Sequence, residues 1–398
     1  MKKLNRRRVL QGLSASALAT TLGRVTFAAG SGEQRLVLVV LRGAVDGLAL
    51  AAPYAEPAYT ALRGRLALDA PGTRNGVLKL DGLFGLHPSM SRVHAMYRND
   101  EALVMHAVAS PYRARSHFDG QDVLEAGSVG VDGTRGGWLN RALGASRSPA
   151  GAIALSHIVP LVLRGESSVS SYAPSRLPDT DDDTLRRLNL LYADDEFFHN
   201  QFSEALAAQA IAKSNGGDAK KRGGGAAAAF LSVMEQTAKF LSAPDGPRIA
   251  VTEADGWDTH ANQGAATGSL ANKFKALDAG LGKLRDGLGK HWANTAVLVV
   301  TEFGRTVRVN GTGGSDHGTG AAALMLGGAI AGGRVVSDWP GLSAQALYQD
   351  RDLAPTMDLR SIFKTALVQH LGLDEARVAA GVFPHSESAP IVANWFKR

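Results

Sequence analysis

Six short runs of apolar residues, separated by stretches long enough to form helices, constrain the fold of this chain most. The runs span residues 36–41, 102–108, 152–155, 249–253, 295–301 and 321–327. They are apolar throughout rather than alternating, which is typical of strands buried on both faces of a sheet. Helical patterns occur at residues 87–97, 184–212, 225–241 and 269–288. We therefore predict a three-layer α/β/α fold with a central, mostly parallel sheet.

Polar side chains follow several of these runs. Proteins with a mostly parallel sheet bind their ligands at the carboxyl ends of the strands, so these side chains are candidates for a functional site. Asp46 lies in the turn after the first run, between Arg42 and Gly47. Its carboxylate is a candidate metal ligand. The alternative is an aspartate that only forms a turn before glycine.

The second polar group follows the run 102–108 and contains two arginines, a hydroxyl and an imidazole: Arg113, Arg115, Ser116 and His117. Ser116 is a candidate nucleophile, because a hydroxyl beside a metal ion can act as one. Arg113 and Arg115 are candidates for holding an oxyanion. The alternative is a surface loop in which the serine caps the following helix.

The third group joins carboxylates and imidazoles after the later runs. Asp258 and His260 are two residues apart in a loop after 249–253, and Glu302 follows 295–301. Asp316 and His317 precede 321–327. The chain has no cysteine, so thiolate ligands are excluded and a metal must be held by carboxylate, imidazole or hydroxyl groups. These donors are sufficient for one or two divalent cations, with zinc, manganese, magnesium and calcium all possible.

The first 29 residues have the features of a twin-arginine export signal. Residues 5–11 contain Arg6 and Arg7, a weakly apolar run covers 13–22, and residues 26–28 supply the small residues that a signal peptidase requires before cleavage near Ala28 or Ala29. We expect cleavage there, export by the twin-arginine translocase, and a periplasmic or extracellular location.

The net charge of +6 has its origin in this leader, which contains six of the 43 basic residues and no acid. The rest of the chain has 37 basic and 37 acidic residues. That balance removes the broad positive field that phosphate backbones require, so nucleic acid is not an expected partner. No apolar run after the leader reaches the roughly 20 residues that span a bilayer, and we expect no membrane span in the mature protein.

Residues 30–398 are expected to form one domain with a helical, flexible insertion around 179–245. Glycines and basic residues at 214–225 predict a surface loop. The acids between Asp179 and Asp183 can bind calcium or, as we favour, stabilise the start of the next helix through its dipole.

Four motifs resemble those of the twin-arginine-exported bacterial proteins of domain of unknown function family 1501, in the alkaline phosphatase-like superfamily. They are the sequences at 115–119, 256–263, 301–306 and 316–318. The resemblance covers nearly the whole mature chain, and it implies an alkaline phosphatase-like (sulfatase-like) fold with one or two metal ions.

By this resemblance, Asp46 looks like the superfamily's early aspartate, Ser116 like the nucleophile, and Asp258 with His260 like the Asp/His pair. Two assignments remain for the other ligands. Either Asp316 and His317 form the Asp-His pair that ends a strand, or Glu302 replaces that aspartate and His317 is the late histidine. We prefer the second. It places Phe303 where the superfamily has a histidine, and His117 or Asp316 can supply the missing ligand.

The resemblance implies a metal-dependent hydrolase of phosphate or sulfate esters, with a small-molecule ester as substrate. The alternative is a degenerate member of the superfamily that binds a ligand or partner without turnover. The phenylalanine at position 303 favours this alternative.

Overall fold

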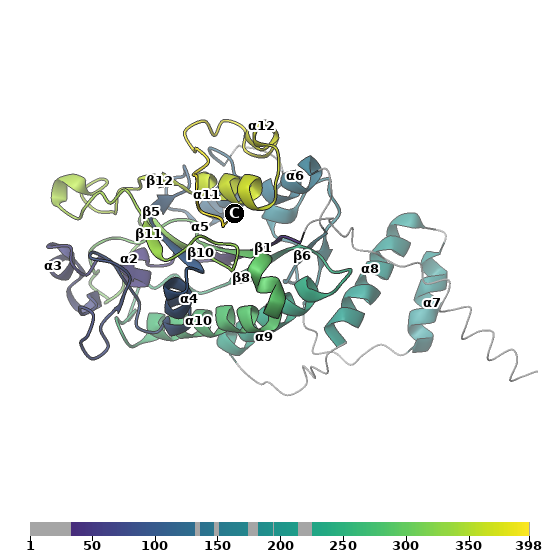
Figure 1. Ribbon diagram of the computed structural model, residues 1–398, viewed down its shortest axis with the longest axis horizontal. Helices are drawn as coiled ribbons and strands as arrows, with labels where there is room; N and C mark the ends of the chain where they lie inside the picture. The colour runs from purple at the N-terminus through teal and green to yellow at the C-terminus, as the bar shows by residue number, and fades with distance from the viewer. Residues whose placement is uncertain are drawn as a thin grey trace, which may run out of the picture.

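The computed structural model describes residues 33–131, 136–146, 151–173, 182–193, 195–213 and 225–397. Its centre is a nine-stranded sheet in the order β11-β5-β10-β9-β1-β8-β6-β7, with β12 paired to β5 (Figure 1). The strands are β1 Arg35–Leu41, β5 Ala102–Ala109, β6 Ala152–Ala154, β7 Ser170–Ser171, β8 Ile249–Ala254, β9 Thr295–Val300, β10 Ala321–Leu326, β11 Arg334–Val336 and β12 Met357–Asp358. All six predicted strands are confirmed within one or two residues.

One strand, β10, runs against the rest of the sheet. It is antiparallel to both of its neighbours, β5 and β9, whereas the other pairs in this sheet are parallel. The mostly parallel sheet is thus confirmed. The reversal has a consequence for the site, because the start of β10 lies at the edge where the parallel strands end. Residues that precede β10 therefore meet residues that follow β1, β5, β8 and β9.

Helices cover both faces of this sheet (Figure 1). Alternate β1 residues such as Val37 and Val39 pack in one core with α4 Ser91–Arg98, α9 Ala226–Ser242 and α10 Ser269–Leu288. The intervening residues, such as Leu36 and Leu38, pack in a second core with α5 His117–Ala126, α6 Trp138–Ala145 and α11 Leu359–Thr365. The three-layer α/β/α arrangement predicted from the apolar runs is confirmed.

The α10 helix illustrates how the sequence sets the layer. Phe274, Leu277, Leu281 and Leu284 recur at helical spacing and are all buried, so one face of the helix packs against the sheet. Asp278 of the same helix accepts hydrogen bonds from the backbone N–H groups of residues 92 and 93, at 3.1 and 2.9 Å. It thereby caps the start of α4 from a neighbouring helix.

Shorter elements complete the chain. Three strands, β2 Ala51–Ala52, β3 Leu78–Lys79 and β4 Gly85–Leu86, form a separate small sheet, and α2 Gly47–Leu50, α3 Tyr59–Arg63 and α12 Glu375–Arg377 are short helices. These elements were not predicted from the sequence, because two to five residues are too few for a hydrophobic period to show.

The helical pattern predicted at 184–212 corresponds to two helices, α7 Asp182–Tyr192 and α8 Glu196–Lys213. Asp195 separates them. Its side chain accepts a hydrogen bond from the backbone N–H of Phe198, at 3.1 Å, as an N-cap does. The predicted leader at 1–29, Asp179 and Asp181, the side chains of Asp182 and Asp183, and the loop residues 214–224 lie outside the described residues.

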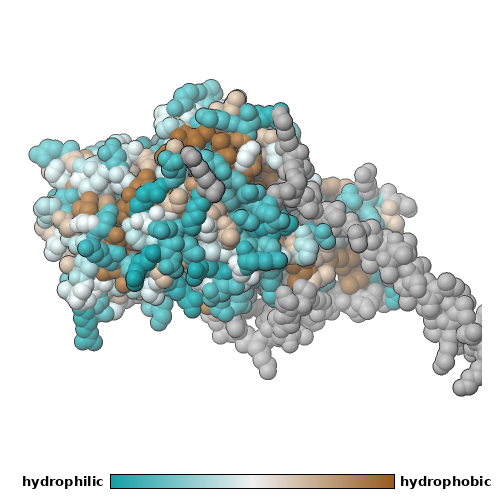
Figure 2. Space-filling model, viewed as in Figure 1, coloured by the Kyte–Doolittle hydropathy of each residue, from teal (hydrophilic) through white to brown (hydrophobic). Residues whose placement is uncertain are grey.

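The face shown in Figure 2 is largely hydrophilic, with hydrophobic side chains gathered near α11 and around α7 and α8. Exposed apolar residues on the latter pair include Leu190, Leu191, Phe197 and Phe198. Across the described residues, the helices are too short or too polar to cross a bilayer.

Candidate metal centre

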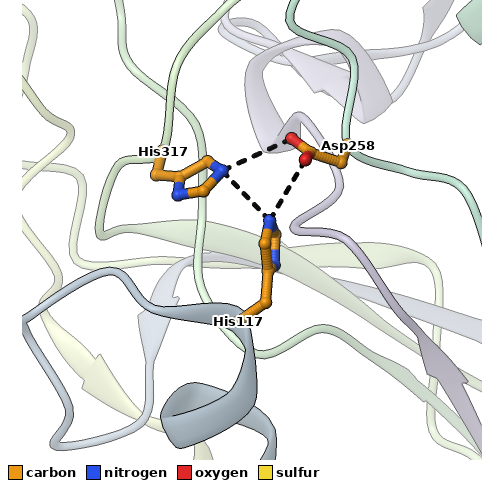
Figure 3. A group of neighbouring side chains, drawn as sticks. All are labelled: His117, Asp258 and His317. Atoms are coloured by element: carbon orange, nitrogen blue, oxygen red, sulfur yellow. Dashed lines mark hydrogen bonds and ion pairs between the residues drawn. The ribbon is translucent and has the colours of Figure 1, made fainter.

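His117, Asp258 and His317 bring their side chains together where the parallel strands end (Figure 3). His117 is the first residue of α5, Asp258 lies in the loop after β8, and His317 lies in the loop before β10. The two Nε2 atoms are 3.0 Å apart. Each lies 3.4 Å from an oxygen of Asp258. One helix N-terminus and two loops that are distant in sequence therefore supply one compact donor set.

His260 extends this set. Its Nε2 atom lies 3.0 Å from His317 Nε2 and 3.0 Å from Asp258 Oδ1. The predicted pair Asp258 and His260 is thus brought together with His317, and the predicted His117 joins them. Gly43 makes the close approach of the loops possible, because it has a φ of 114° and a Cβ there would lie 2.6 Å from the Asp258 nitrogen.

Each of the three imidazoles has its Nδ1 atom next to an acceptor. The acceptors are Glu302 for His117 at 2.7 Å, Asp316 for His260 at 3.0 Å, and the Arg115 carbonyl for His317 at 2.9 Å. In the neutral rings, Nδ1 therefore donates and Nε2 presents a lone pair. The lone pairs converge on one another and on a carboxylate, which is unfavourable unless a proton or a cation lies among them.

The distances fit a small divalent cation. Ligand atoms about 2.0–2.1 Å from a tetrahedral zinc ion are roughly 3.3–3.4 Å from one another. The Nε2 atoms of His117 and His317 are 3.0 Å apart, and each lies 3.4 Å from a different oxygen of Asp258, Oδ2 for His117 and Oδ1 for His317. An acceptor behind each imidazole is also the usual arrangement around histidine ligands. The residues present are consequently able to hold a metal ion, with imidazole and carboxylate as ligands.

Glu302 was predicted as a metal ligand, but the structure places it behind His117. It is fully buried. Its Oε1 accepts hydrogen bonds from His117, the Gly43 N–H and Gln121, and its Oε2 accepts one from Thr301. Burial acts to raise the pKa of Glu302, but the hydrogen bonds, first that from His117, lower it below its ordinary value. Glu302 is therefore a charged acceptor that orients His117.

Asp316 was also predicted as a ligand and likewise lies behind an imidazole. It accepts hydrogen bonds from His260 and from the Asn310 amide, at 3.0 Å each. Hydrogen bonding from Asn310 is the main cause that lowers the pKa of Asp316, with a further contribution from His260. Of the residues in the two alternative assignments, His317 and His117 contribute to the converging donors, whereas Glu302 and Asp316 lie behind imidazoles.

A buried arginine balances the carboxylate of the site. Arg305 donates to Asp258 Oδ1 at 2.5 Å and also to the Ser315 carbonyl. Partial burial opposes ionisation of Asp258, but the hydrogen bond and charge of Arg305 keep its pKa below the ordinary value. Arg305 was not assigned a role from the sequence, although it lies inside the motif at 301–306. The sequence offered one clue to its role, namely a positively charged residue inside a motif that was expected to supply a cation ligand.

The pKa values of the two closest imidazoles shift in opposite directions. The hydrogen bond to Glu302 raises the pKa of His117. Burial, followed by the charges of His117 and Arg305, lowers the pKa of His317.

Asp46 does not join the donor set. It is 1% exposed, forms an ion pair with the equally buried Arg63, and accepts hydrogen bonds from Gln263 at 2.6 Å and from the Ala49 N–H at 3.2 Å. It is the N-cap of α2. The turn-forming alternative considered for this aspartate therefore describes its position better than the ligand hypothesis.

The predicted arginines make structural contacts. Arg113 donates to the carbonyls of Ser110 and Tyr112, on its own loop. Arg115 donates to the fully buried Asp352 at 2.7–2.8 Å and to Gln349 at 2.7 Å. Its backbone has a φ of 64°, in the left-handed region that non-glycine residues seldom adopt. This conformation accompanies the hydrogen bond from His317 to the Arg115 carbonyl.

Ser116 occupies the N-cap position of α5, next to His117, but its hydroxyl makes no capping hydrogen bond. The side chain is half-buried, and the backbone N–H donates to the Tyr112 hydroxyl at 3.1 Å. The serine thus adjoins the donor set with its hydroxyl uncommitted to the helix.

Fold and site together define a three-layer α/β/α protein with a candidate His/Asp metal centre at the carboxyl edge of its sheet. The chain belongs to the family described as "Protein of unknown function (DUF1501)", whose model matches residues 33–383. This confirms the family resemblance seen in the sequence motifs. Among curated proteins, none matches the chain significantly.

Several solved structures resemble the chain at low identity. The C-terminal periplasmic domain of EcEptC from Escherichia coli, in complex with Zn, has 10% identity and a TM-score of 0.41, covering 92% of this chain and 88% of that one. The PsFucS1 sulfatase from Pseudoalteromonas sp. has 13% identity and a TM-score of 0.38, covering 94% and 73%. The phosphonate monoester hydrolase of Agrobacterium radiobacter has 12% identity and a TM-score of 0.36, covering 86% and 74%. The sheet topology itself defines the fold.

Proposed function

We propose that this protein is a metal-dependent hydrolase of phosphate or sulfate esters. The observation that carries the proposal is the convergence of three imidazole Nε2 atoms and a carboxylate, each imidazole having an acceptor at Nδ1. His117, Asp258 and His317 would hold the cation, with His260 adjoining. A divalent cation at this position supplies a Lewis acid that withdraws charge from an ester oxygen.

Ser116 is the nucleophile in this proposal. It precedes His117 at the N-terminus of the ten-residue helix α5, where backbone N–H groups and the helix dipole favour an anion. Its hydroxyl is not used in a cap, so it is available to attack an ester. Arg115 acts as a positioning residue, because its carbonyl holds His317 and its side chain holds Asp352.

The test separates metal binding from turnover. Ser116→Ala should abolish hydrolysis of aryl phosphates, phosphodiesters or sulfates while metal content stays near wild type. Asp258→Ala should lose both, because a ligand is removed. Ser128→Ala is a matched control, since that serine lies just past the other end of α5 and donates only to the Gly130 carbonyl. Wild-type turnover in Ser116→Ala would exclude this serine from the mechanism.

Two contacts favour the alternative of a binding protein without turnover. Arg305 already neutralises Asp258, and the buried Phe303 ring stacks on His117 with centroids 4.9 Å apart. If the alternative is right, protein purified from the exporting host contains no stoichiometric metal in elemental analysis and is inert on every ester tested.

We further propose that residues 1–29 direct export through the twin-arginine pathway, which places the mature protein in the periplasm or outside the cell. Replacing Arg6 and Arg7 together by Lys should retain the precursor in the cytoplasm, because the translocase recognises the arginine pair. Cell fractionation measures this, and unchanged periplasmic accumulation of mature protein would contradict it.

A further inference from the structure

The side chain of Gln263 joins the two loops that carry Asp258 and His317. It is fully buried. Its Oε1 atom accepts hydrogen bonds from the hydroxyls of Thr259 and Ser315, at 2.8 Å each. Thr259 directly follows Asp258, and Ser315 lies two residues before His317. One amide oxygen therefore connects the loop after β8 with the loop before β10.

The nitrogen of the same amide is anchored on a buried ion pair. Gln263 Nε2 donates to Asp46 Oδ2 at 2.6 Å, and the same oxygen pairs with Arg63. An ionised carboxylate only accepts hydrogen bonds, so Asp46 fixes the orientation of the amide, and the amide oxygen faces the two hydroxyls. Arg63 also donates to the carbonyls of Thr306 and Val307, at 3.3 and 3.2 Å. The anchor is thereby tied to the segment that links β9 and β10.

Ser315 extends these contacts to the carboxylate of the donor set. Its hydroxyl accepts a hydrogen bond from Arg305 Nε at 3.4 Å, and Arg305 donates to Asp258 at 2.5 Å. The backbone joins the two loops as well, because the Ser315 N–H donates to the Thr259 carbonyl at 3.2 Å. Gln263, Ser315, Thr259 and Arg305 are all buried. A buried polar network whose hydrogen bonds are made restricts its members to one arrangement.

We propose that Gln263 is a positioning residue for the candidate metal centre. It sets the separation of the two loops, and with it the distance between Asp258 and His317 (Figure 3). This role rests on the proposed function, because it requires that these donors hold a cation. Metal sites bind tightly when supporting hydrogen bonds hold the ligands in place. Asp46 then supports the site through Gln263, without being a ligand.

The test is a cobalt(II) titration of the mature protein, followed by the visible absorption bands of the bound ion, which report affinity and coordination geometry together. Gln263→Met removes the amide and keeps a side chain of similar length. Its dissociation constant should be about tenfold or more above that of wild type, as for other residues that support metal ligands, and its bands should differ from those of wild type. Wild-type affinity and wild-type bands in Gln263→Met would overturn the proposal.

Two threonine variants separate positioning from a general loss of stability. Thr259→Val removes one hydrogen bond to Gln263 and should raise the dissociation constant by about 2–12-fold, the value of one hydrogen bond. Thr237→Val is the matched control, because Thr237 is also buried and donates to the Val233 carbonyl within α9, at 2.8 Å. This control should bind cobalt as wild type does. Equal losses of affinity in the two variants would overturn the proposal.

Hydrogen exchange of the metal-free protein tests the same role without a cation. In Gln263→Met, the backbone amides of residues 258–263 and 312–317 should exchange faster than in wild type, because the two loops separate more easily. In Thr237→Val, exchange in these two segments should stay as in wild type. Unchanged exchange in Gln263→Met would overturn the proposal. If wild type binds no cobalt while these segments exchange faster in Gln263→Met, the proposed hydrolase function fails and the positioning of the two loops by Gln263 stands.

Discussion

The stability of this protein should fall on acidification below pH 6.5, because two histidines are buried in the neutral form. Burial lowers the pKa of His87 and the pKa of His106 from 6.5 to about 4. In each ring, Nε2 donates to a backbone carbonyl, that of Ala265 or Ala51, and Nδ1 accepts from a backbone N–H. Protonation of Nδ1 removes an acceptor and creates a buried charge.

The sign of the effect follows from proton binding. Between pH 4 and 6.5, the unfolded chain binds a proton at these histidines and the folded protein does not, so unfolding becomes more favourable as the pH falls. Each histidine contributes up to about 1.4 kcal/mol per pH unit, and roughly 3 kcal/mol over the whole interval. The contribution is absent above pH 6.5, where both states are neutral.

The assay is guanidinium unfolding followed by circular dichroism at several pH values between 4 and 7, for wild type and for His106→Gln. The variant is less stable at pH 7, and the difference between the two proteins should shrink by about 2–3 kcal/mol as the pH falls to 4, because the variant has lost one titrating group. His157→Gln, at an exposed position, should keep the wild-type slope. Parallel curves for wild type and His106→Gln would refute the reasoning.

Two further variants test contacts described above. Glu302→Gln removes the charge behind His117 and should weaken metal binding about 10–100-fold, as measured by competition with a chelator; unchanged affinity would show that Glu302 does not act through the imidazole. Asp278→Ala removes the acceptor of two N–H groups at the start of α4 and should lower the free energy of unfolding by about 1–2 kcal/mol. Asp286→Ala on the same helix, where the exposed ion pair with Arg92 is lost, should cost less than about 1 kcal/mol. Equal losses in the two aspartate variants would contradict the capping role.

Six strands of the central sheet were predictable because they are apolar on both faces, whereas β7, β11 and β12 have only two or three residues and were not predicted. Val37 and Leu38 point to opposite cores, and both are buried, so neither face of β1 required polar residues. The direction of β10 was not predictable, since an apolar run has the same composition whichever way it is paired. The break at Asp195 was missed because the helical pattern continues on both sides of it.

The location of the site was predictable, but the role of each side chain was not. Loops that follow parallel strands meet at one edge, and this brought Asp258, His260 and His317 together as expected. Whether a carboxylate contacts the converging donors or lies behind an imidazole depends on the path of the loop. Glu302 has the carboxylate group of a metal ligand, but it lies behind His117 and accepts a hydrogen bond from its Nδ1 atom. Asp46 forms an ion pair with Arg63 instead of joining the site. Arg63 lies 17 residues further along the chain, and no local sequence pattern indicates this pairing.

Because β9 and the reversed β10 are adjacent in the sheet, the segment 301–320 leaves and re-enters the sheet on neighbouring strands. This segment contains Glu302, Arg305, Asp316 and His317, while its two ends are anchored by the strand pairing. Its side chains nevertheless contact residues of other segments, such as His117 and Asp258. A substitution in this segment would therefore change the chemistry of this edge through those contacts, while the pairing of β9 with β10 keeps the order of strands.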